Sequence, residues 1–173
     1  MHSKWVFKHF CPGSNKRNVL LAMLWGGGLL AGVSLCAYTP FATESILYGV
    51  MYAKPSLLSL FLIGVMPVLF TAVCAFTSLH PIAYVLILLS AITHGFSGTA
   101  IYLAVGSAAW IVRPLLLFTS SSTSVLMWWL LLQRNTRRGA HKQVGLALFL
   151  SLLVYLLDFF ILSPLIGDLT KVL

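Results

Sequence analysis

Long runs of apolar residues dominate this chain, and short polar or charged segments separate them. About 20 consecutive apolar residues form a helix that crosses the hydrocarbon core of a bilayer, whereas transmembrane strands are shorter and alternate apolar with polar side chains. The runs here are continuous and near that helical length. They predict an all-α polytopic membrane protein of about five transmembrane helices, over about 18–38, 56–79, 82–98, 115–133 and 144–166.

The apolar stretch over 82–112 fits neither one crossing nor two. As a helix it is longer than a bilayer is thick, yet it is too short for two full crossings and a turn. Polar or helix-breaking residues also interrupt it at Gly95 and Gly98. We therefore predict one crossing that ends at Gly98, followed by a re-entrant or interfacial segment over 99–112. Whether 99–112 crosses the membrane stays open at this point.

The composition agrees with a membrane protein. With 60% hydrophobic residues, 8% charged residues and a mean hydropathy of +0.98, the chain has too few polar side chains to cover a soluble globule. The lipid bilayer is therefore the first partner that we expect.

The net charge of +8 comes mainly from two basic clusters, one before the first span and one between the last two spans. Basic residues gather on the cytoplasmic side of membrane proteins, so both clusters indicate orientation, and no nucleic acid partner is expected. The sequence predicts a cytoplasmic basic arm over 1–17, a single transmembrane helical domain over 18–166 and an outer tail over 167–173. The protein would then be a multi-pass protein of the cell membrane with a cytoplasmic amino terminus and an outer carboxyl terminus.

Several glycines and one proline mark places where helices change direction or approach closely. Gly28 and Gly32 form a GxxxG pair, a pattern that lets another helix pack closely, and Gly95 and Gly98 are further candidates for helix packing. Packing within the chain is favoured, and a partner helix is the alternative. Pro67 lies near the centre of the second span and predicts a kink there.

Asp158 is an acidic residue inside a predicted span, where an ionised carboxylate is costly and faces a partner or water. Arg113 is its predicted partner, and this pair would hold the re-entrant segment against the last helix. An ion or proton pathway is the alternative role for Asp158.

Uncharged polar residues form a second group of intramembrane candidates. His94 beside two glycines is interpreted as a hydrogen-bonded packing residue, with a proton relay as the alternative. A run of five hydroxyl residues places polar groups on every face of a helical turn, so part of the run should line a polar interior. Helix contact is favoured for the run over a substrate path; its members are Ser120, Ser121, Ser122, Thr123 and Ser124.

The residue inventory disfavours catalysis. The chain holds three acidic residues, and Cys11, Cys36 and Cys74 follow no metal-binding spacing. No phosphate-binding loop, serine nucleophile motif or paired-histidine metal motif occurs in it. We therefore predict a non-enzymatic protein with no catalytic residues, no cofactor and no metal site.

The order of the predicted spans, together with Gly95, Phe96 and Gly98 and the apolar segment over 100–109, resembles the stage II sporulation protein M family. The resemblance covers about half of the chain. It departs from the family pattern in one region, where Arg113 and Pro114 precede the hydroxyl run.

This resemblance implies a polytopic scaffold in the mother-cell membrane of an endospore former. With a lytic enzyme and an amidase, such a scaffold would help the septal peptidoglycan remodelling that drives engulfment. The chemistry would belong to those cell-wall-remodelling partners.

Three functions remain open from the sequence, and an intramembrane enzyme is the last of them. A non-enzymatic membrane scaffold in a multiprotein assembly is the first. The alternative is a small transporter or channel subunit with a polar path through the broken-helix region. A polar cavity that joins the hydroxyl run to Asp158 would favour this alternative, because transporters place broken helices at such sites.

Overall fold

The structure, a computed structural model, describes residues 15–39, 56–77, 79–133, 140–162 and 164. Predictions for the arm up to residue 14, the connection over 40–55, the basic segment over 134–139 and the tail lie outside these residues. The described backbone is built from helices, in the order α2 (Asn15–Tyr38), α4 (Leu57–Gly64), α5 (Met66–Phe76), α6 (His80–Val105), the 3-10 turn η1 (Gly106–Ala108), α7 (Ala109–Leu116), α8 (Phe118–Gln133), α9 (Ala140–Leu157) and the π-helical turn η2 (Asp158–Leu162).

Four of the described helices are long and apolar enough to cross a membrane. A further pair, α7 and α8, meets at a bend of 62° and brings the number to as many as five if the pair counts as one span. The all-helical class is therefore as predicted, and the predicted number of about five spans compares with four to five candidate spans among the described residues. The four are Arg17–Tyr38, Leu57–Phe76, Pro81–Ala104 and His141–Leu162.

Helix α6 differs from its predicted extent, because it continues past Gly98 to Val105. The residues over 99–105 thus belong to α6 and form no separate segment. The interruption falls at Gly106, whose φ of 58° is a conformation that glycine adopts without strain. Gly95 and Gly98 do not end the helix because a helix tolerates glycine wherever a neighbouring helix packs against it.

The second candidate span is interrupted at Val65, between α4 and α5. Pro67 lies in the first turn of α5 and has no backbone N–H, so the carbonyl of Ile63 lacks the donor that a continuous helix would supply. The N–H of Val65 still donates to the carbonyl of Phe61 at 2.9 Å. The interruption therefore lies next to the proline that predicted a kink.

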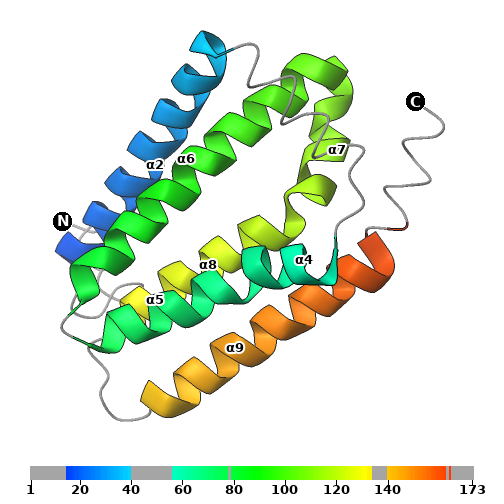
Figure 1. Cartoon of the computed structure of the whole chain (residues 1–173). Helices are drawn as coiled ribbons and strands as arrows, with labels where there is room; N and C mark the ends of the chain where they lie inside the picture. The colour runs from blue at the N-terminus through cyan, green and yellow to red at the C-terminus, as the bar shows by residue number, and fades with distance from the viewer. Residues whose placement is uncertain (1–14, 40–55, 78, 134–139, 163, 165–173) are drawn as a thin grey trace, which may run out of the picture.

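The helices form two groups that face each other (Figure 1). Helix α2 lies along α6, and the two pack closely over most of their length. On the other side α5, α8 and α9 lie side by side, with α4 against α8 and α9. Helix α6 also contacts α5 and α8, and α7 connects the two groups at one end.

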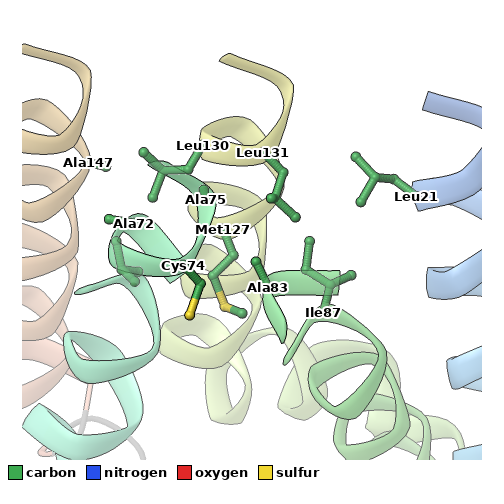
Figure 2. Close-up of a cluster of buried hydrophobic side chains, with 11 residues drawn as sticks. Leu21, Ala72, Cys74, Ala75, Ala83, Ile87, Met127, Leu130, Leu131 and Ala147 are labelled. Carbon is green, nitrogen blue, oxygen red and sulfur yellow. The ribbon is translucent and has the colours of Figure 1, made fainter. Parts of the chain in front are cut away.

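An apolar core lies at the end of the bundle where α2, α6 and α9 begin and α5 and α8 end (Figure 2). Beyond this core, buried positions include polar residues, among them His94, Thr119 and Asp158, beside a smaller apolar cluster at Val65 and Tyr155. The core thus closes one end of a bundle whose middle holds both polar and apolar buried residues. Its buried members are Leu21, Val68, Ala72, Cys74, Ala75, Ala83, Ile87, Met127, Leu130, Leu131 and Ala147.

Candidate functional site

A partly open cavity of about 570 Å³ lies between α4, α5, α6, α8 and the start of η2. Apolar side chains make up most of its wall, and polar side chains form one part of it, for which we call it the polar cavity. Leu86 and Met127 line it and also belong to or pack on the apolar core, so the core closes the cavity on that side. Other apolar lining residues come from α4, α5, α6 and the α7–α8 bend. The polar lining residues are Ser90, Thr93, His94, Ser97, Thr119, Ser120, Thr123 and Asp158.

Helical spacing explains how these polar side chains meet. Residues four and seven apart lie on one face of a helix. Ser90, His94 and Ser97 have this spacing on α6, and Thr119 and Thr123 have it on α8. Each helix therefore turns a polar stripe toward the cavity.

Asp158 lies on the cavity surface with 9% of its area exposed. Its Oδ2 accepts a hydrogen bond from the hydroxyl group of Thr119, which joins η2 to α8. Within the described side chains, no cation pairs with this carboxylate. Asp158 is also the first residue of the π-helical turn, and such turns often occur where a helix presents a functional side chain.

The predicted partner Arg113 lies on α7, but its side chain is outside the part of the structure that is described. Its pairing with Asp158 stays a prediction. The observed partner, Thr119, directly precedes the hydroxyl run and was not among the candidates from the sequence.

Three helices meet at the carbonyl group of Gly64, where α4 ends. This carbonyl accepts hydrogen bonds from Ser151 Oγ on α9 at 3.0 Å and from Thr123 Oγ1 on α8 at 3.1 Å. A Cβ atom on Gly64 would lie 3.1 Å from the methyl group of Thr119, so glycine permits this close approach. These hydrogen bonds hold the interrupted span against α8 and α9, close to Thr119 and its partner Asp158.

His94 joins α6 to α8 and α2. It is buried, with 6% of its area exposed, and its Nδ1 lies 2.8 Å from the carbonyl oxygen of Ser90. A carbonyl accepts and never donates, so Nδ1 carries the hydrogen and Nε2 is an acceptor in the neutral ring. Ser121 Oγ lies 3.2 Å from Nε2 and is its donor, while the ring of Trp25 lies 5.5 Å from the imidazole ring. These contacts agree with a hydrogen-bonded packing residue, and the cavity position keeps the relay alternative open.

The hydroxyl groups around the cavity direct their hydrogens at backbone carbonyls. Thr93 donates to Ser90 O at 2.8 Å and Ser120 donates to Leu117 O at 3.1 Å. Thr123 shares its hydrogen between Thr119 O at 2.7 Å and Gly64 O at 3.1 Å. A hydroxyl group has one hydrogen and two acceptor lone pairs. Once the hydrogen is used, the oxygen offers only acceptor capacity to the cavity.

A chain of two further hydroxyl groups follows the same rule. Ser124 donates to Ser120 O at 2.8 Å, so in the 2.6 Å contact between Ser90 and Ser124 the donor is Ser90. Ser90 therefore also keeps only acceptor capacity. The polar cavity is consequently rich in acceptors.

The hydroxyl run divides between the two roles considered for it. Ser120 and Thr123 line the polar cavity, while Ser121 and Ser124 contact α6 through His94 and Ser90. Ser122 is half-buried and does not line the cavity. Different residues of this short segment thus contact the neighbouring helix and line the polar cavity.

The glycine candidates pack α2 against α6. A Cβ atom on Gly32 would lie 2.1 Å from the carbonyl oxygen of Ile92, and one on Gly95 would lie 2.2 Å from that of Leu29. Gly28 faces Ala91 at 2.7 Å in the same way. Gly98 is buried and lines a smaller cavity of about 310 Å³ beside α2. Gly28, Gly32 and Gly95 therefore bring α2 and α6 close together within the chain, whereas a packing role for Gly98 stays a prediction.

Ser90, Thr119 and Ser151 were not among the residues predicted for the site, although the sequence carries a signal for two of them. Ser90 precedes His94 by one helical turn, and Ser151 precedes Asp158 by two. A polar residue one or two turns from a costly intramembrane residue lies on the same helix face. Thr119 was hidden by its position at the edge of the longer run.

Comparisons with protein-family models, curated proteins and solved structures found no match to this chain. The function is therefore argued from the chemistry of the polar cavity. Among the described residues no group of three or more His, Cys, Asp or Glu side chains lies together.

Proposed function

We propose that this protein is an integral membrane protein that binds a small polar solute in the polar cavity and carries it across the bilayer, as a small transporter or a transport subunit. The observation that carries this proposal is the polar cavity itself. It brings buried hydroxyl groups, His94 and Asp158 together between helices that are apolar enough to span a membrane.

Membrane residence is supported by the outer surface of the bundle. Large apolar side chains are exposed on several helices, for example Leu30 on α2, Phe70 on α5 and Phe149 on α9. A soluble protein rarely exposes so much contiguous apolar surface. Hydrocarbon chains of lipid would cover these side chains without cost.

A polar interior inside such a bundle supports solute binding. Polar groups at membrane depth are costly, and an irregular backbone is tolerated there only when it lines a cavity or is buried in protein. The backbone is irregular at the α4–α5 interruption and at the α7–α8 bend, and both places lie beside the polar cavity. The cavity volume of about 570 Å³ also falls within the range of small-molecule sites.

The division of the bundle into two groups supports movement of the solute. Close glycine contacts join α2 to α6, and α6 faces α4, α5 and α8 across the cavity. Alternating access commonly involves rocking of one helix group against another around a fixed site. The apolar core would be the barrier that must open on one side.

The scaffold implied by the sporulation-family resemblance stays a second prediction. A scaffold acts through its exposed surfaces and needs no polar cavity. The cavity therefore favours the transporter, and partner proteins remain a prediction of the resemblance alone.

Labelling of one engineered cysteine from both sides of the membrane tests the proposal. In a chain whose native cysteines are replaced by alanine, Ser97→Cys places a thiol in the cavity wall. Leu30→Cys is the matched control, because its neighbour Leu29 contacts Gly95 and its own side chain is exposed on the outside of the bundle.

A membrane-impermeant methanethiosulfonate should label Ser97→Cys both in intact cells and in inverted vesicles, and should leave Leu30→Cys unlabelled. This pattern requires a site that water reaches alternately from each side. Labelling of Ser97→Cys from one side alone would contradict transport, and no labelling from either side would exclude an aqueous cavity.

A further inference from the structure

We infer that the polar cavity takes a small monovalent cation, either an alkali ion or the ammonium group of an organic solute, with Asp158 as its counter-charge. This inference rests on the proposed function and names the class of solute. Three observations on the cavity wall carry it.

The first observation is the poor compensation of Asp158. The carboxylate is nine-tenths buried, lines the cavity and receives one hydrogen bond, from Thr119, among the described side chains. A buried carboxylate with so few donors is unstable as a charge unless a cation approaches it. The adjoining cavity is the space from which that cation would come.

The second observation is the acceptor character of the surrounding wall. Ser90, Thr93, Ser120 and Thr123 all direct their hydrogens away from the cavity, and the one lone pair of neutral His94 Nε2 already accepts from Ser121. Oxygen lone pairs stabilise a cation or a donor-rich ammonium group. An anion would meet the carboxylate and these lone pairs, with the hydroxyl group of Ser97 as the remaining donor among the described lining residues.

The third observation is the helix interruption. The carbonyl end of α4 carries the partial negative charge of the helix dipole, and it lies beside the cavity at Ile63 and Gly64. Pro67 leaves the Ile63 carbonyl without its helical donor. Unwound carbonyl groups at such interruptions coordinate cations in transporters of other folds.

Two other titratable groups near Asp158 have hydrogen-bond partners of their own. His94 Nδ1 donates to the Ser90 carbonyl at 2.8 Å, and the hydroxyl group of Tyr155 donates to Leu57 O at 3.2 Å. Arg113 is the one predicted competitor, so the experiment removes it as well.

The experiment measures thermal unfolding of the purified full chain in detergent, at constant ionic strength set with tetrapropylammonium chloride, whose cation has no N–H group and whose charge is shielded by its alkyl groups. Sodium, potassium and methylammonium chlorides replace this salt in three separate series. A ligand present at about a hundred-fold excess over its dissociation constant should raise the Tm by roughly 5 °C or more. Asp158→Asn should abolish the rise.

The three series separate the sources of the cation. A rise with sodium or potassium identifies an alkali ion, and a rise with methylammonium alone identifies an organic ammonium group. No rise with any of the three, or an equal rise in Asp158→Asn, overturns the inference. A Tm that depends on pH but on none of the three salts also overturns it, because a proton alone then neutralises Asp158.

Two further variants keep the result decisive. If Asp158→Asn does not fold, Asp158→Glu keeps the charge but displaces it, and should raise the half-saturating cation concentration roughly ten-fold. If Arg113→Gln responds to a cation and the wild type does not, Arg113 is the counter-charge and the inference fails.

The labelling of Ser97→Cys remains independent of these outcomes. Two-sided labelling without any cation response would leave a transporter of an uncharged solute and refute only the cation. Failure of both measurements would refute the transporter as well.

Discussion

At the scale of single residues, the hydrogen bond that Thr119 donates to Asp158 helps to stabilise a carboxylate in the interior of this bundle. Thr119 donates to Asp158, and its methyl group lies against the position of Gly64. The side chain thus connects α8 to η2 through its hydroxyl group and to α4 through its methyl group. Valine would keep the methyl contact and lose the donor, which separates the two roles.

We predict that Thr119→Val lowers the free energy of unfolding by about 1 to 2 kcal/mol, because a buried carboxyl group then loses its donor. Thr119→Ser keeps the hydroxyl group and should lose less. Unfolding of the purified protein in a series of denaturing detergent mixtures measures both variants. A serine variant that is less stable than the valine variant would show that the methyl contact matters more than the hydrogen bond.

At the scale of elements, the contact between α2 and α6 depends on glycines that lie one turn apart. Gly28 and Gly32 let the backbone of α2 reach α6, while Gly26 and Gly27 on the same helix have open space around their Cα atoms. The same residue type therefore has different roles within one turn. This arrangement supplies a matched pair of substitutions.

We predict that Gly32→Ala destabilises the fold by about 1 to 3 kcal/mol, because its Cβ atom would overlap the backbone of α6. Gly27→Ala should be neutral or stabilising by up to about 1 kcal/mol, since alanine favours a helix and meets nothing there. Thermal unfolding of both variants checks the difference. Equal stability of the two would contradict the close packing of α2 on α6.

At the scale of the whole molecule, apolar run length was enough to predict the helical class and the presence of four to five helices that are long and apolar enough to span a membrane. It failed to predict where α6 ends, because a glycine in the sequence looks the same whether it ends a helix or lets a neighbouring helix pack closely, as at Gly95 and Gly98. Only the contact of Gly95 with Leu29 distinguishes the two. The true break at Gly106 depends on a backbone angle that no periodicity reveals.

The candidate site was predictable in part for a related reason. Asp158, His94 and the hydroxyl run were conspicuous because polar residues are rare in such apolar helices. Their joint position on one cavity depends on how four helices pack, and so does the role of Thr119. The Gly64 carbonyl gave no sequence signal, because every residue carries a carbonyl group and only the interruption at Val65 makes this one available.

The most direct test is to measure how strongly two sites on α8 contact deuterated water. It shows whether a water-filled cavity lies inside a bundle that is embedded in a membrane. Nitroxide labels on Ser120→Cys, in the cavity wall, and on Val125→Cys, which is 67% exposed on the outside of the same helix, would be compared by electron spin echo modulation in bilayers. We predict strong deuterium contact at 120 and little at 125. Little contact at both sites would mean a dry bundle, and strong contact at both would mean that the outer face of α8 meets water and that the membrane assignment is wrong.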